Sequence, residues 1–129
     1  MSKEPPQKPT ASELEILHVL WTRGPSTVRE VHEALSEKKV MGYTTVLKLL
    51  QIMTAKGTVR RDEGQRAHVY EACQPATETK RQLVSDVLQR VFEGSTSELM
   101  IHALEGRRTS KKELEELRRL LDEYERSVR

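Results

Sequence analysis

The sequence predicts a mostly helical protein with one small β-hairpin. Charged residues make up 33% of the 129 residues and aromatic residues only 4%, a balance that favours helices. Apolar residues recur at helical spacing in six segments. Between the third and fourth of these segments, two short β-prone runs flank a glycine, which is the pattern of a hairpin. This order predicts a winged helix-turn-helix followed by a C-terminal helical region.

The first helix is expected to begin near Thr10 and to end before Gly24. Residues 1–9 contain three prolines and no apolar periodicity, which predicts a disordered lead-in. Two capping boxes are available at the start of the helix, one from Thr10 and one from Ser12. Its apolar stripe comprises Leu14, Ile16, Leu17, Leu20 and Trp21, which we interpret as core.

The second and third helices follow a Gly-Pro break. Ser26 or Thr27 caps the short second helix, which carries Val28, Val31 and Leu35 on one face. The third helix spans residues 43–56, and Gly57 supplies its C-terminal stop. Its inward residues are predicted to be Val46, Leu49, Leu50 and Met53.

The hairpin is predicted from residues 58–62 and 66–71, joined by residues 63–65 with Gly64 at the tip. Three helices followed by a hairpin is the order of a winged helix. We therefore expect a DNA-binding domain over residues 10–73 and a separate helical dimerisation domain over residues 74–129.

Three amphipathic segments make up the predicted C-terminal domain. The first lies beyond Pro75, is marked by apolar residues from Leu83 to Phe92 and extends up to Gly94. The second follows a capping box at Ser95 and stops at Gly106, and the third begins at Ser110. The third carries a seam with the 3–4 spacing of a heptad repeat. The residues expected at a dimer interface are Leu83, Val87, Val91, Leu114, Leu117, Leu121 and Tyr124. The alternative is that the seam folds back on the first of these helices within one chain.

The outer face of the third helix has the chemistry of a base-reading surface. The residues that cluster opposite the inward ones are Thr44, Lys48, Gln51 and Ala55, with Thr45 and Ile52 at the flank. Amide, hydroxyl and cationic side chains are the groups that read base edges in the major groove. The alternative interpretation is a merely solvated helix face.

Basic residues in the hairpin favour the DNA interpretation. Five cations between residues 43 and 70 face only two carboxylates, Asp62 and Glu63. Phosphate contacts supply most sequence-independent affinity, so a basic wing beside a polar helix divides the work between positioning and readout. The predicted wing contacts are Arg60, Arg61, Arg66 and His68. The alternative is that Arg60 and Arg61 pair with Asp62 and Glu63.

Five segments, in this order, carry a resemblance to a known family: SELEILHVLW at 12–21, GPSTVREVH at 24–32, GYTTVL at 42–47, Lys56-Gly57 and RAHVY at 66–70. Together they closely resemble the penicillinase repressor family of BlaI/MecI type, which also includes a branch of copper-responsive repressors. The likeness covers residues 10–72 at motif level and continues in layout through the C-terminal helices.

The resemblance implies a homodimeric repressor that binds palindromic operators of double-stranded DNA. It places the recognition helix on Thr44, Thr45, Lys48 and Gln51, and the wing on the three arginines named above. Family members are relieved by C-terminal proteolysis, triggered by a membrane-bound sensor metallopeptidase that detects β-lactams. The comparable stretch here, residues 99–104, lacks the Asn-Phe pair of the staphylococcal repressors. The candidate cleavage segment is Ile101, His102 and Ala103.

Other chemistry has little support in the sequence. The four histidines show no metal-ligand spacing, the copper-responsive branch's Cys-x-Cys motifs are absent, and no metal or other cofactor is expected. No nucleophile–base pair or phosphate-binding glycine loop predicts an enzyme. The lone Cys73 and the lack of a membrane-spanning run predict a cytoplasmic protein without membrane insertion.

Two alternative functions remain open from the sequence. The first is a winged-helix module that binds protein rather than DNA. The second is a repressor controlled by another signal, either oxidation of Cys73 or a small ligand.

Overall fold

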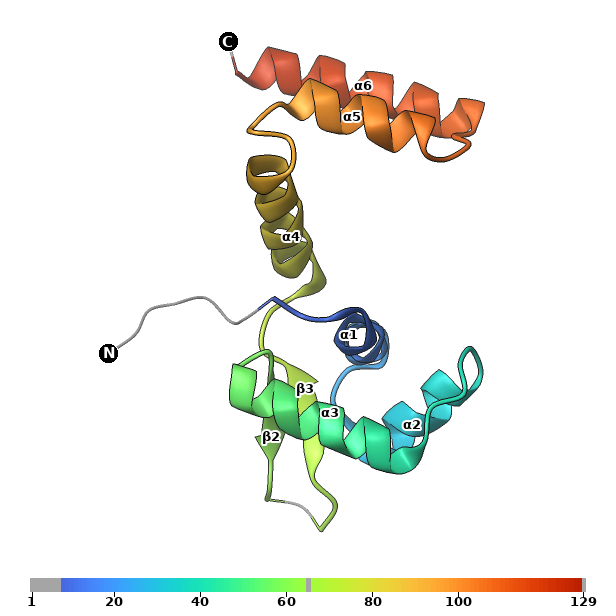
Figure 1. Ribbon diagram of the computed structural model, residues 1–129, viewed down its shortest axis with the longest axis vertical. Helices are drawn as coiled ribbons and strands as arrows, with labels where there is room; N and C mark the ends of the chain where they lie inside the picture. Colours follow the sequence, from blue (N-terminus) through green and yellow to red (C-terminus); the bar gives the residue numbers. More distant parts are fainter. Residues whose placement is uncertain (1–7, 65, 129) are drawn as a thin grey trace, which may run out of the picture. The chain divides into compact units, whose positions relative to one another are not determined.

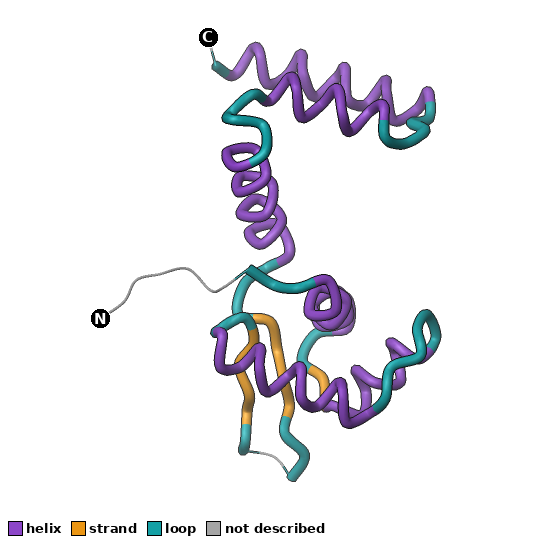
Figure 2. The backbone as a smooth tube through the Cα atoms, viewed as in Figure 1, coloured by secondary structure: helices purple, strands orange, loops and turns teal. Residues whose placement is uncertain are grey.

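A computed structural model describes residues 8–64 and 66–128 of the chain. Its elements are α1 (Ala11–Arg23), β1 (Ser26–Thr27), α2 (Val28–Ser36), α3 (Tyr43–Lys56), β2 (Val59–Asp62), β3 (Val69–Ala72), α4 (Ala76–Arg90), α5 (Thr96–Glu105) and α6 (Lys111–Ser127), shown in Figures 1 and 2. The predicted fold class is confirmed. Most of the predicted lead-in, residues 1–7, lies outside the described residues.

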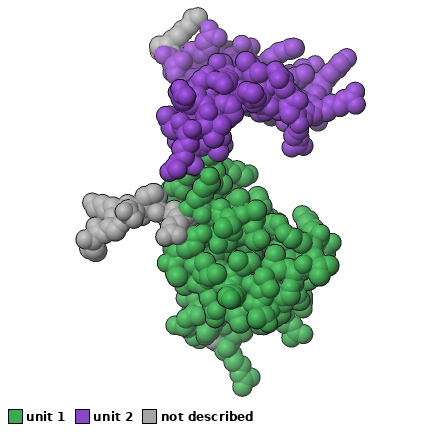
Figure 3. Space-filling model, viewed as in Figure 1, with its two compact units in different colours: residues 1–83 green, residues 84–129 purple. Residues whose placement is uncertain are grey.

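The chain forms two compact units, residues 1–83 and 84–129, coloured separately in Figure 3. Helix α4 contributes residues to both units. The predicted division into a DNA-binding domain that ends at residue 73 and a dimerisation domain that begins at residue 74 concerns function, and it stays a prediction.

Local capping explains where the helices begin. Thr10 caps α1 and Thr27 caps α2, each accepting a bond from the backbone N–H three residues on, at 3.2 Å. Glu13 and Glu30 reciprocate to the cap backbone, which completes two capping boxes. Of the two predicted alternatives at each start, the structure therefore uses Thr10 rather than Ser12 and Thr27 rather than Ser26.

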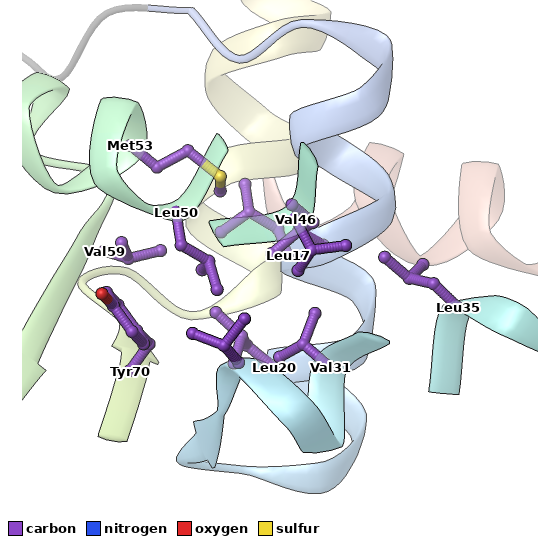
Figure 4. Close-up of a cluster of buried hydrophobic side chains, with 11 residues drawn as sticks. Leu17, Leu20, Val31, Leu35, Val46, Leu50, Met53, Val59 and Tyr70 are labelled. Atoms are coloured by element: carbon purple, nitrogen blue, oxygen red, sulfur yellow. The ribbon is translucent and has the colours of Figure 1, made fainter. Parts of the chain in front are cut away.

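The core of the first unit is formed by α1, α2, α3 and the sheet, which meet around one apolar cluster (Figure 4). Its fully buried members include Ile16, Val31, Val46, Leu50 and Met53. Leu49, predicted to face inward, is only half-buried. The sheet adds Val59 and Tyr70, which are 2% and 1% exposed.

Trp21 lies at the edge of the core cluster and is half-buried. Its indole Nε1 donates to the backbone oxygen of Gln74 at 2.9 Å. The predicted core role therefore holds for the ring, and the polar end of the indole also ties α1 to the segment before α4.

The sheet has three antiparallel strands in the order β1–β3–β2. The hairpin is shorter than predicted, because its connection runs from Glu63 to His68 rather than over three residues. The third strand, β1, was not predicted: Ser26 pairs with Tyr70 and Thr27 with Val69. A two-residue strand next to a helix cap carries no alternating pattern, so only its partner reveals it.

The second unit contains the end of α4 together with α5 and α6. Helix α4 ends at Arg90, four residues before the predicted stop, and the chain then turns through Glu93 and Gly94, which both take positive φ angles, 49° and 85°. Ser95 and Ser110 cap α5 and α6 as predicted. No described residue of α5 or α6 is buried in the single chain.

Candidate nucleic-acid interface

Helix α3 is held in place along its inner face and at its C-terminal end. Val46, Leu50 and Met53 are completely buried against α1 and α2. Gly57 closes the helix with φ 85°, and its N–H bonds back to Met53 and Thr54. Fixing the helix in this way leaves its opposite face on the surface.

An ion pair that could not be predicted from the sequence also anchors the C-terminal end of α3. Lys56 Nζ lies 2.6 Å from Glu13 Oε1, and these side chains are only 15% and 4% exposed. The two residues are 43 positions apart. The same carboxylate completes the α1 capping box, so one buried acid joins the first turn of α1 to the last turn of α3.

The outer face of α3 carries the four residues predicted to read bases. Thr44, Thr45, Lys48 and Gln51 are all exposed. Within the described part of the chain, their side chains form no hydrogen bond or ion pair. Polar groups that the protein leaves unpaired on a rigid helix remain available to an external partner.

Two larger side chains border this face: Ile52, which was expected at its flank, and Tyr43, which the prediction did not assign to it. Tyr43 is 48% exposed and Ile52 is 42% exposed. The ring of Tyr43 contacts the ring of His32 on α2 edge-on, with centroids 5.8 Å apart. In the sequence, each of these two residues stood out only as a large, mostly apolar side chain on the polar side of the helix.

The predicted wing arginines fall into two groups. Arg60 and Arg61 are engaged within the hairpin: Arg60 Nε lies 2.6 Å from Glu71 Oε1, and Arg61 Nη2 lies 2.6 Å from Glu63 Oε1. The hydrogen bond that Arg60 donates to Glu71 raises the pKa of Arg60, and the Tyr70 side chain is the main cause that raises the pKa of Arg61.

The alternative that Arg60 and Arg61 pair with Asp62 and Glu63 is therefore correct for Arg61 only. Arg61 does pair with Glu63, but Asp62 instead accepts from the backbone N–H of Gly64 at 2.8 Å. Arg66 and His68 are exposed and have no partner among the described residues. The uncommitted cationic surface of the hairpin therefore lies in its connecting segment.

The residues considered for control by another signal, such as oxidation or a metal, do not form a site in the described part of the chain. Cys73 is half-buried, and its backbone N–H donates to Thr58 at 3.0 Å. The described residues contain no group of three or more metal-ligating side chains. In the described chain, none of the helices is long and apolar enough to cross a membrane.

A groove of about 680 Å³ lies between α1 and α2 in the first unit. Its charged lining mixes both signs and includes Glu15, Glu33, Arg23, Lys38 and Lys39. Lys39 and Glu15 form an ion pair at 3.2 Å. Mixed charge of this kind favours no particular class of small ligand.

The residues predicted at the dimer interface differ in their exposure, and three of the seven are exposed apolar side chains. Leu121 is 66% exposed, Tyr124 67% and Val91 66%, whereas Leu114 and Leu117 are half-buried. In α4, Leu83 and Val87 are also half-buried. The candidate cleavage residues Ile101, His102 and Ala103 are exposed in the middle of α5.

Comparison with known proteins gives consistent matches over most of the chain. The model of the family described as "Penicillinase repressor" matches residues 9–123. The transcriptional regulator BlaI of Mycobacterium tuberculosis is 36% identical over 115 residues, covering 88% of this chain and 82% of that protein. The penicillinase repressor of Bacillus licheniformis is 25% identical, covering 88% of each.

The fold also matches a solved structure. The monomeric form of Bacillus licheniformis BlaI, determined in complex with the blaP half-operator, superposes with a TM-score of 0.51 and 22% identity. The match covers 57% of this chain and 90% of that chain.

Proposed function

The chain belongs to the penicillinase repressor family, and on that basis we propose that it is a DNA-binding transcriptional repressor rather than an enzyme. One observation of the molecule carries the proposal. The face of α3 opposite the core holds two threonines, a lysine and a glutamine that are exposed and unpaired within the described residues. These are the side chains that pair with base edges in a major groove, which admits one helix.

The wing supplies the second part of the interface. Arg66 and His68 can contact phosphate without breaking an existing bond within the described chain. Phosphate contacts fix the orientation of the protein on the duplex, and the α3 side chains then discriminate among sequences.

We propose further that the repressor acts as a homodimer. The exposed seam of α6 and the absence of buried residues among the described parts of α5 and α6 support a second copy that covers this surface. Two-fold symmetry then requires a palindromic operator, whose half-sites lie about one helical turn, or a multiple of it, apart. A repressor with this partner acts in the cytoplasm, where the operator is.

We also propose how the repressor is controlled: cleavage in its C-terminal region relieves repression. Relief by proteolysis requires cleavage near Ile101–Ala103, which lies within a helix and has to unfold locally before a protease can reach its backbone. Loss of α6 then removes four of the seven residues proposed for the dimer interface, Leu114, Leu117, Leu121 and Tyr124. The proposed targets are β-lactamase or other resistance genes. Immunoblotting after β-lactam exposure tests this: induced target transcripts alongside a fully intact repressor would contradict it.

DNA binding is tested by fluorescence anisotropy with the chain's own promoter fragment and with an unrelated duplex, at 50–200 mM salt. We expect affinity for both to fall with salt, because counterions are released from phosphates. Gln51→Ala should lose about 1–3 kcal/mol on the promoter fragment and little on the unrelated duplex.

Lys112→Ala provides the control, because Lys112 is an exposed lysine of α6 that belongs neither to the proposed base-reading face of α3 nor to the wing. It should leave both affinities unchanged. Absent or salt-insensitive binding would contradict the repressor and favour a protein-binding module.

A further inference from the structure

The hairpin contains two carboxylates, each bonded to an arginine that would otherwise be available to DNA. Arg60 and Glu71 are directly opposite each other in the register of β2 and β3. Their side chains join at 2.6 Å, although 62% of the Arg60 side chain and 42% of the Glu71 side chain remain exposed. Glu71 is therefore placed to hold Arg60 from across the strand pair at the surface of the wing.

The strand register separates this pair from Arg61. Residues directly opposite in an antiparallel pair project to the same face, and neighbours along a strand project to opposite faces. Arg61 lies opposite buried Tyr70, on the face that includes buried Val59, whereas Arg60 and Glu71 share the other face. The backbone thus directs the side chains of Arg60 and Arg61 toward opposite faces of the hairpin at their Cβ atoms.

A carboxylate at this distance occupies the same donors that a phosphate would use. The guanidinium offers a planar fork of N–H groups, and carboxylate and phosphate oxygens bind it in the same way. For phosphate to take Arg60, it has to displace Glu71 or share the guanidinium with it. The pair also brings no net charge to the DNA, so it releases fewer counterions than a free arginine does.

Building on the proposed DNA-binding function, we propose that Glu71 is an internal competitor of DNA phosphate for Arg60 and so limits the wing's contribution to DNA affinity. Arg66 and His68, which have no such partner in the described chain, are then the wing groups that contact phosphate in the wild-type protein. Glu71 acts through Arg60 and is a modulating residue, not a DNA contact.

A double-mutant cycle with Glu71→Gln and Arg60→Gln in the full chain tests the proposal. The probe is a labelled 20-base-pair duplex of unrelated sequence, titrated at several salt concentrations between 50 and 200 mM. Glu71→Gln should tighten binding and steepen the plot of log affinity against log salt by about 0.9, the value for one phosphate neutralised. The gain at 50 mM should therefore exceed that at 200 mM by about 3.5-fold. In the Arg60→Gln background, Glu71→Gln should change the slope very little.

Each other result has a defined meaning. An unchanged slope for Glu71→Gln overturns the proposal, because no further phosphate is then neutralised. The same gain in affinity with and without Arg60 also overturns it, because simple removal of a negative charge would then explain the result. Wild-type protein that binds no DNA at any salt concentration overturns the proposed function instead.

Two further variants serve as controls for the double-mutant cycle. Glu123→Gln removes a carboxylate that pairs with Arg119 on α6 at 3.1 Å, and it should leave the slope unchanged. If Glu71→Gln lowers the melting temperature, Glu71→Thr, which suits a strand, replaces it in the same cycle and must give the same steepening.

Discussion

Replacing Lys56 by Met should destabilise the first unit more than any change at a surface ion pair. At 2.6 Å and an effective dielectric constant of about 20, the attraction between Lys56 and Glu13 is about 6 kcal/mol, which offsets the comparable cost of desolvating two ions. The intact pair is therefore close to neutral in its net effect. Removing the lysine leaves a carboxylate that is 4% exposed without its cation.

We expect Lys56→Met to cost about 3 kcal/mol, the lower end of the range for breaking a buried pair, because Lys56 keeps 15% of its side chain exposed. Adding Glu13→Gln should return the stability to within about 1 kcal/mol of wild type, since no buried charge then remains. The glutamine oxygen can still accept from the Thr10 N–H, as Glu13 does at 3.2 Å.

Urea unfolding followed by the fluorescence of Trp21, the single tryptophan, measures these changes. With an m-value of about 2 kcal/mol/M, the midpoint for Lys56→Met should fall by about 1.5 M. Protomer concentration has to be the same for every variant, because self-association changes apparent stability.

Lys39→Met is the matched control. It removes another lysine paired with α1, but Lys39 and Glu15 are 50% and 36% exposed, so the loss should stay below about 1 kcal/mol. The reasoning is refuted if Lys56→Met costs no more than Lys39→Met, or if the Glu13→Gln/Lys56→Met double variant is as unstable as Lys56→Met alone.

Three further outcomes follow from the structure. Gly57→Ala should lower the free energy of unfolding by about 1 kcal/mol, measured in the same urea assay, because an L-residue is strained at φ 85° although nothing lies within 4 Å of the added methyl group. The bond from the Thr27 backbone holds the pKa of Glu30 below its usual 4.5, so this acid stabilises the fold above its unfolded pKa and the stabilisation is lost as pH falls through the folded pKa. The melting temperatures of wild type and Glu30→Gln should therefore differ at pH 7 and converge as the pH falls through the lowered pKa of Glu30; a constant difference would be inconsistent with this. Leu121→Glu should shift a sedimentation profile to monomer and weaken binding to a full palindrome while leaving half-site binding intact; unaltered dimers would place the interface elsewhere.

The sequence by itself determined the features that depend on neighbours along the chain. The caps at Thr27, Ser95 and Ser110, the stop at Gly57 and the 3.6-residue period of α3 are local patterns, so the helix order could be predicted. The same period separated Val46 and Leu50 from the polar face of α3, and so the candidate base-reading residues could be named.

Only the tertiary structure decided how distant residues use their charges and backbone groups. Nothing near Lys56 in the sequence indicates Glu13, and two-residue β1 exists only because β3 lies beside it. Arg60 and Arg61 look equivalent as neighbours, yet strand alternation and the register with β3 give one to Glu71 and the other to Tyr70 and Glu63. The physical reason is that these interactions depend on which residues lie close together in space. The tertiary fold decides this, and local conformational preference along the chain does not.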